Sequence, residues 1–155
     1  MSEATRITLP NDVMLGSVRD LIKEGHPVVI MTKGVSMLPF IEGKKDSVLL
    51  VAPDGLKPGD IALAEVVPGR YVLHRVREIS ADRVVLQGDG NYRGQEVCPP
   101  GQVCAKVKEI QHPDGSSTDP ASVRQQRRWR RWAAVPPIVR RYWLALYRRI
   151  KRITI

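Results

Sequence analysis

The sequence predicts a mainly β, antiparallel body with a short N-terminal helix and a C-terminal basic amphipathic helical tail. Three observations favour this class: short β-branched apolar runs fill the middle of the chain, turn residues separate the runs, and arginines gather at the end. Such runs, bounded by glycine and proline, are typical of strands joined by turns. The length of 155 residues suits one domain with a tail.

Four parts follow from this pattern along the chain. We expect an N-terminal segment with a helix over residues 1–27, a β domain over 28–111, a linker over 112–123 and a basic tail over 124–155. The linker is rich in proline, glycine, serine and aspartate, which is typical of turns and loops.

The predicted helix lies between Asp12 and Glu24, where apolar residues recur at helical spacing. Asn11 or Asp12 can cap its start, and Gly25 can end it. The predicted strands cover residues 28–31, 47–51, 61–66, 70–76, 83–87 and 103–110. Because turn residues punctuate these runs, we expect them to pair as an antiparallel sheet.

Positive charge is concentrated in the tail. The whole chain carries a formal net charge of +9. Residues 124–155 hold ten arginines, one lysine and no acidic residue, so they carry +11 and leave −2 for the rest. Residues 1–123 are therefore close to neutral, and the positive net charge of the chain comes from the tail.

The tail falls into two pieces because Pro136 and Pro137 interrupt it. In the second piece the apolar residues share one helical face, and basic residues take the flanks and the opposite face. The apolar residues are Val139, Tyr142, Trp143, Leu146, Ile150 and Ile153, and the basic ones include Arg140, Arg141, Arg148, Lys151 and Arg152. Such a helix suits an anionic membrane surface, which we favour. Packing on the body and binding of nucleic acid stay open as alternatives.

The compartment is suggested by what the sequence lacks. Residues 1–10 have no apolar run of the kind found in a secretory signal, and no stretch reaches the roughly 18 to 20 apolar residues of a membrane span. We expect a cytoplasmic protein, peripheral on the inner membrane surface through its tail.

Cys98 and Cys104 match no redox or zinc motif, so we expect thiols, with a disulfide as the alternative under oxidising conditions. We expect no cofactor and no metal.

Candidate catalytic residues occur in three places along the β domain. Residues 34–41 read GVSMLPFI and contain Ser36, and His74 and Asp89 follow in later segments. A serine hydroxyl is a poor nucleophile unless a base lies within hydrogen-bond reach and an acid orients that base. Singly, Ser36 fits a turn, His74 a surface strand position and Asp89 a hairpin. Their joint occurrence predicts a nucleophile, a base and an orienting acid, in that order.

Four segments carry a resemblance to a known family. GVSMLPFI, LKPGDIALAEV, YVLHRV and VVLQGDGN occur in this order within about residues 28–110. They resemble the motifs of the signal peptidase I superfamily, which implies a coiled β fold and a serine peptidase acting on a peptide or protein. His74 followed by Arg75 is similar to the archaeal and endoplasmic-reticulum type, whereas the eubacterial type uses a lysine. A neutral imidazole serves as base near pH 7 without special desolvation.

The chain departs from that family in three ways. The acid expected several residues after the Gly-Asp motif is missing, which leaves Glu96 as an alternative to Asp89. Gly34 stands where these enzymes commonly place a serine, so the oxyanion would rely on backbone N–H groups such as that of Ser36. No N-terminal membrane anchor is evident. We therefore expect an enzyme that trims a leader or precursor peptide, with a non-catalytic scaffold whose tail binds membrane or nucleic acid as the alternative.

Overall fold

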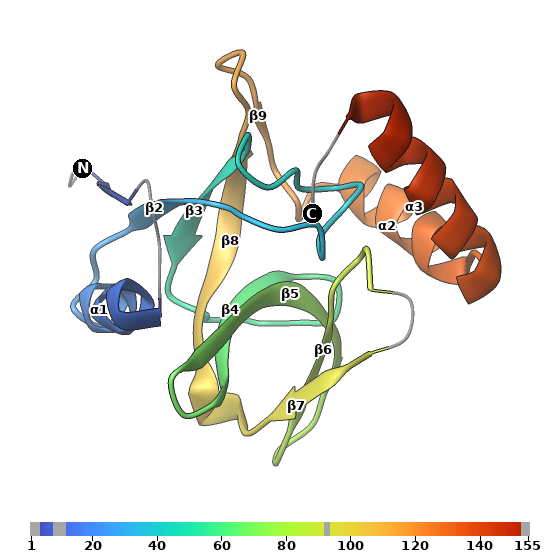
Figure 1. The fold of residues 1–155 in the computed structure, drawn as a ribbon. Helices are drawn as coiled ribbons and strands as arrows, with labels where there is room; N and C mark the ends of the chain where they lie inside the picture. The colour runs from blue at the N-terminus through green and yellow to red at the C-terminus, as the bar shows by residue number, and fades with distance from the viewer. Residues whose placement is uncertain (1–3, 8–11, 92–93, 153–155) are drawn as a thin grey trace.

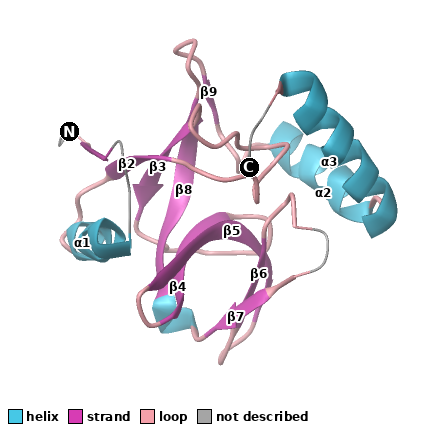
Figure 2. Ribbon diagram, in the orientation of Figure 1, coloured by secondary structure: helices cyan, strands magenta, loops and turns pink. Residues whose placement is uncertain are grey.

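The computed structural model describes residues 4–7, 12–91 and 94–152 (Figure 1). Two residues that figure in the expectations above, Asn11 and Ile153, lie outside the described residues. The protein is mainly β, as predicted. One α-helix follows the first short strand, a short 3-10 helix covers Pro100–Gln102, and two α-helices follow the last strand (Figure 2).

The described strands join in one mixed sheet. The order is β1-β2-β3-β8-β4-β5-β6-β7, with β9 beside β8. Their bounds are β1 Thr5–Ile7, β2 Val28–Met31, β3 Ser47–Val51, β4 Ile61–Val67, β5 Arg70–Ile79, β6 Val84–Gln87, β7 Glu96–Cys98, β8 Val103–Gln111 and β9 Ser117–Thr118. The pairing of β1 with β2 is parallel, and the other pairings that the structure describes are antiparallel.

All six predicted strands are present, and three further strands were not predicted. β1, β7 and β9 are three, three and two residues long. So short a run shows no alternation of apolar and polar residues, which is the signal that identifies a strand in a sequence. β7 matters most because it carries Glu96.

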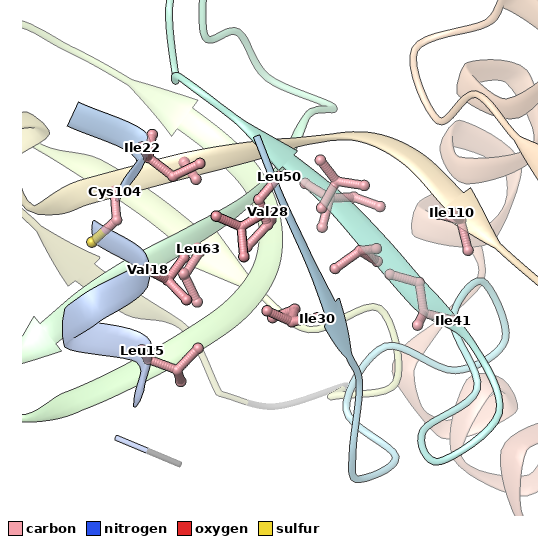
Figure 3. Packing of buried hydrophobic residues seen from close by; sticks show 14 of the residues in the cluster. Leu15, Val18, Ile22, Val28, Ile30, Ile41, Leu50, Leu63, Cys104 and Ile110 are labelled. Carbon is pink, nitrogen blue, oxygen red and sulfur yellow. The ribbon is translucent and has the colours of Figure 1, made fainter. Parts of the chain in front are cut away.

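The N-terminal helix, α1, spans Asp12–Lys23 and covers one face of the sheet. Leu15, Val18 and Ile22 of α1 point into a cluster of buried apolar side chains that includes Val28 and Leu50 (Figure 3). Full burial of each such side chain contributes roughly 1.5 to 3 kcal/mol. This cluster is the main core of the protein.

The tail forms α2 (Val123–Ala134) and α3 (Pro137–Lys151), as the two predicted pieces. Ser122 caps α2 by accepting a hydrogen bond from the Gln125 N–H, and Pro137 occupies the first turn of α3. Figure 1 shows the two helices side by side at one end of the sheet. In the part of the chain that the structure describes, no helix has the length and apolar character needed to cross a membrane.

The segment predicted as a linker is attached to the body. β9 pairs with β8, and His112 holds the turn between them. Its Nδ1 lies 2.9 Å from Asp46 Oδ1 and its Nε2 lies 2.7 Å from Thr118 Oγ1. Ser117 and Thr118 therefore extend the sheet, and residues 112–116 form the turn that leads to them.

Candidate active site

Ser36 lies in the loop between β2 and β3, and its neighbours are anchored in the core. Met37 and Ile41 belong to the main apolar cluster, and Leu38 is also buried. Gly34 begins the turn with a φ of 81°, a backbone conformation that residues with a Cβ rarely adopt. The apolar residues of GVSMLPFI thus fix the loop, and Ser36 itself stays partly exposed.

His74 lies on β5 and reaches the nucleophile. Its Nε2 is 3.2 Å from Ser36 Oγ, and the ring is buried. The pairing of His74 with Ala62 of β4 fixes its position in the sheet. For Nε2 to accept the Ser36 proton, the neutral ring must carry its hydrogen on Nδ1.

Glu96 provides the acceptor for that hydrogen. Its Oε2 is 2.9 Å from His74 Nδ1, and its Oε1 is 3.9 Å from Arg70 Nη2. The pairing of Glu96 with Leu86 of β6 brings β7 alongside the site. Ser36, His74 and Glu96 therefore form a continuous hydrogen-bonded line.

Asp89, which we predicted as the orienting acid, has a different partner, and that assignment is corrected. Its Oδ1 and Oδ2 accept hydrogen bonds from Arg75 Nε at 3.2 Å and Nη2 at 2.6 Å. Neighbouring residues on a strand project to opposite faces, so an acid bound to Arg75 lies across β5 from the His74 ring. Among the residues that the structure describes, Glu96 is the carboxylate that hydrogen-bonds His74.

The Arg75–Asp89 pair is deeply buried, with side chains 2% and 1% exposed. Burial raises the pKa of Asp89, and the Arg75 guanidinium beside it opposes that rise. Arg75 Nη1 also donates to the Gly59 carbonyl oxygen at 3.0 Å. A buried charge is tolerated only when its hydrogen bonds are satisfied, so Asp89 is needed for Arg75 to occupy this position.

The glycines around Asp89 let its loop lie against the nucleophile loop. The Gly90 N–H donates to the Ser36 carbonyl oxygen at 2.8 Å. A Cβ on Gly88 would collide with that same oxygen and lie 3.2 Å from His74 Nε2. A Cβ on Gly90 would lie 2.6 Å from the Val35 carbonyl oxygen. The Gly88-Asp89-Gly90 loop therefore fixes the backbone at Ser36, the candidate nucleophile.

The Ser36 N–H is available to a bound oxygen. Among the described residues no acceptor takes its hydrogen bond. A backbone N–H at the nucleophile is a common component of an oxyanion hole. The expectation that backbone donors serve where Gly34 replaces a serine stays a prediction.

A cleft of about 400 Å³ opens at the three residues. Ser36, His74 and Glu96 line it together with apolar side chains such as Ile30 and Leu63. The cleft is mainly apolar, with a small number of polar groups that could orient a ligand.

The helix α2 contacts the loops that build the site, which sequence reasoning missed. Trp132 Nε1 donates to the Asp89 carbonyl oxygen at 2.7 Å, and Gln126 Nε2 donates to the Gly59 carbonyl oxygen at 3.0 Å. The Arg75 guanidinium lies 5.3 Å from the Trp129 ring centroid, close enough for a cation–π contact. In the sequence the tryptophans of the tail favour membrane or partner binding, and they carry no local signal of these contacts.

Comparisons with known proteins give no assignment. No protein-family model matches the chain, and no curated protein shows a significant match to it.

The described residues contain no cluster of three or more histidine, cysteine, aspartate or glutamate side chains placed to hold a metal ion. Cys98 and Cys104 are buried and unpaired, as we expected.

Proposed function

We propose that the protein is a serine-type peptidase in which Ser36 is the nucleophile, His74 the base and Glu96 the orienting acid. The observation that carries the proposal is the line of contacts at 3.2 Å and 2.9 Å that joins the three side chains at the cleft. A serine hydroxyl is activated only when it is hydrogen-bonded to a base that an acid orients, and the contacts of His74 with Ser36 and Glu96 supply that arrangement.

The reaction begins when Ser36 Oγ attacks the carbonyl carbon of the scissile bond. His74 Nε2 takes the hydroxyl proton, and Glu96 stabilises the resulting imidazolium through Nδ1. The Ser36 N–H donates to the oxyanion as the carbonyl oxygen gains charge. His74 then gives its proton to the leaving amine, and a water molecule, deprotonated by the same histidine, hydrolyses the acyl-enzyme.

The motif resemblance supports a peptide substrate. The segments that resemble the signal peptidase I superfamily supply Ser36, His74 and the Gly88–Asp89 loop, and these three lie together in the fold. The substrate we propose is a leader or precursor peptide, entering the cleft in extended form.

The test is cleavage of candidate leader-bearing peptides, read by mass spectrometry. We expect products from the full-length protein and none from Ser36→Ala, with a sharp fall for His74→Ala. Ser80→Ala and His26→Ala, at exposed positions away from the cleft, serve as matched controls and retain the activity. A serine-directed fluorophosphonate probe gives a second measurement on the same variants.

If the folded wild-type protein neither cleaves peptides nor takes the probe, the peptidase proposal is wrong. The alternative is a non-catalytic scaffold whose tail binds a surface.

We also propose that α3 attaches the protein to an anionic membrane surface. Its apolar face points away from the body, with Tyr142 67%, Leu146 56% and Ile150 71% exposed. The residues that α3 turns inward are Arg140 and Leu144, which are buried. A helix that exposes its apolar face and belongs to a segment of +11 charge suits lipid headgroups and acyl chains.

Liposome flotation tests this attachment with point variants. We expect binding to vesicles that contain anionic lipid, much weaker binding to neutral vesicles, and loss of binding in Leu146→Ser/Ile150→Ser. The control is Val67→Ser/Val97→Ser, which removes two apolar side chains of similar exposure from the body. Equal binding by all variants would contradict the proposal. Concentration-dependent dimerisation that the α3 variant abolishes would instead assign the face to a second copy.

A further inference from the structure

A second hollow lies on the other side of the nucleophile loop from the cleft. It has a volume of about 460 Å³. One wall consists of Val35, Leu38 and Gly90, and the other is formed by residues of α3, which include Arg141, Leu144 and Arg148. We call this hollow the α3 groove.

The α3 groove lies directly beside Ser36. Val35 precedes the nucleophile in the chain, and the Gly90 N–H donates to the Ser36 carbonyl oxygen at 2.8 Å. Gly34, Ser36 and Met37 line the cleft on the opposite side. A peptide whose scissile bond lies at Ser36 could therefore place the residues on one side of that bond in the cleft and those on the other side in the α3 groove.

The groove is positively charged. Arg141 and Arg148 are seven residues apart, so they lie on the same side of α3, about 10 Å apart along its axis. Among the described residues, neither guanidinium makes an ion pair or a side-chain hydrogen bond, and no acidic residue lines the groove. Two unpaired guanidinium groups over an apolar floor suit carboxylates, which they bind in bidentate fashion.

The spacing also fits a peptide in extended form. An extended chain advances about 3.3 Å per residue, so about three residues cover the distance between the two arginines. Side chains alternate between the two faces of an extended chain, so carboxylates two or four residues apart, about 7 or 13 Å, share a face and can reach both arginine side chains.

We propose that the α3 groove is a subsite for a carboxylate-bearing segment of the substrate next to the scissile bond. Arg141 and Arg148 bind the carboxylates, which come from aspartate or glutamate side chains or from the free C-terminus of the substrate. This inference rests on the proposed peptidase function, and it adds the chemical class of the substrate.

Binding to the full-length Ser36→Ala protein tests the subsite without cleavage. The probes are fluorescein-labelled octapeptides of equal length: one with two aspartates four residues apart and an amidated end, its asparagine counterpart, and the asparagine peptide with a free carboxylate. Fluorescence anisotropy at 150 mM NaCl gives the dissociation constants. We expect at least one carboxylate peptide to bind about tenfold more tightly than the neutral amide, as one charge-assisted contact provides.

Charge-matched variants separate the groove from the general charge of the tail. In Arg141→Gln/Arg148→Gln the preference for carboxylate falls below about twofold, whereas Arg127→Gln/Arg149→Gln, at exposed positions outside the groove, retains it. Arg141→Glu/Arg148→Glu reverses the preference toward a peptide with two lysines. Circular dichroism melting checks that each variant is folded.

Three outcomes are decisive. Equal loss in both glutamine variants, or no preference in the unaltered groove, overturns the subsite. Cleavage by the wild-type protein at a bond with neither an acidic residue nor a free C-terminus beside it also overturns the subsite, while the peptidase proposal stands. Carboxylate binding that depends on Arg141 and Arg148, without cleavage of any peptide, sinks the peptidase proposal and leaves a carboxylate-binding groove.

Discussion

Two carboxylates on either side of β5 have different functions. Glu96 contacts the ring of His74, and Asp89 contacts the guanidinium of Arg75. In the proposed mechanism the first contact sets the tautomer of the base His74, whereas the second compensates the buried charge of Arg75. Substitutions that remove one charge and keep the shape separate these functions.

Glu96→Gln is expected to impair the reaction and leave the fold intact. An amide cannot stabilise the His74 imidazolium and favours the wrong tautomer, so cleavage should slow by about 10³- to 10⁴-fold. Steady-state cleavage rates and a thermal melt measure the two effects. Glu78→Gln, which alters an exposed carboxylate on the same strand as His74, is the matched control. A large loss of stability with normal cleavage would reverse our assignment.

Asp89→Asn is expected to act mainly on stability. The substitution leaves the Arg75 charge buried without a carboxylate, which costs roughly 3 to 5 kcal/mol of unfolding free energy. Urea denaturation measures the loss. The double variant Arg75→Met/Asp89→Leu should recover much of it, because no buried charge remains. A stability equal to that of the wild type in Asp89→Asn would show that the pair is dispensable.

The two cysteines are expected to react slowly in the folded protein. Burial raises the pKa of both Cys98 and Cys104, so less of each thiol is thiolate near pH 7 and fewer react with iodoacetamide. Mass spectrometry should find little alkylation before denaturation and two modified thiols after it. Because the folded-state pKa values are raised, the native rate should increase as the pH rises above about 8.5. Rapid labelling at neutral pH would be inconsistent with this environment.

At the scale of elements, α2 supports the site through the two turns it contacts. Trp132 binds the carbonyl of Asp89, and the next residue, Gly90, binds the carbonyl of Ser36. Gly59 accepts hydrogen bonds from both Arg75 and Gln126, and a Cβ at Gly59 would collide with the Gln126 side chain. The helix is therefore packed against the Gly59 turn and the Asp89 loop of the candidate site.

Trp132→Phe is expected to weaken catalysis more than stability. The ring remains, but the N–H donor to Asp89 is lost, at a stability cost of about 1 kcal/mol. Looser placement of the Gly90 and Ser36 backbones should slow cleavage by roughly tenfold to a hundredfold. Trp143→Phe changes the tryptophan that packs edge-to-face on Trp132 and removes no hydrogen bond among the described residues, so it is the control. Equal rates in the two variants would contradict a positioning function for Trp132.

At the scale of the whole molecule, the tail and the body share one structure. α2 covers the Arg75–Asp89 pair on one side, and the Phe40 ring lies 5.1 Å from the same guanidinium. The outer face of α3 is apolar and exposed, and its inner side borders the groove beside Ser36. One helical pair therefore lies between the exposed apolar face of α3, which we propose binds membrane, and the proposed peptidase site.

Deletions of the tail should have unequal effects. Removal of residues 121–155 exposes Arg75 to solvent and removes its cation–π contact with Trp129. We therefore expect the free energy of unfolding to fall by more than about 2 kcal/mol. Removal of residues 137–155 keeps α2 and should cost less. Denaturation midpoints of both shortened proteins measure the difference. Similar midpoints for both would mean that α2 contributes little to the fold.

Much of the fold was predictable because its strands and helices carry their own periodic patterns. The six longer strands and α1 were found within a few residues of their bounds. The sequence also singled out Ser36 and His74, through motif order, and retained Glu96 as an alternative acid. It missed β7 and the contacts of Gln126 and Trp132, because very short strands and contacts distant in sequence leave no local signal.

The amino-acid sequence alone specifies the mainly β class, the serine and histidine, and a tail that is both basic and amphipathic. These properties depend on composition and local spacing, which can be read along one chain. The three-dimensional arrangement is needed to choose between Asp89 and Glu96 and to show which way α3 faces. The choice of acid depends on the pairing of β7 with β6 and on the buried charge of Arg75, both of which arise only when distant segments pack together.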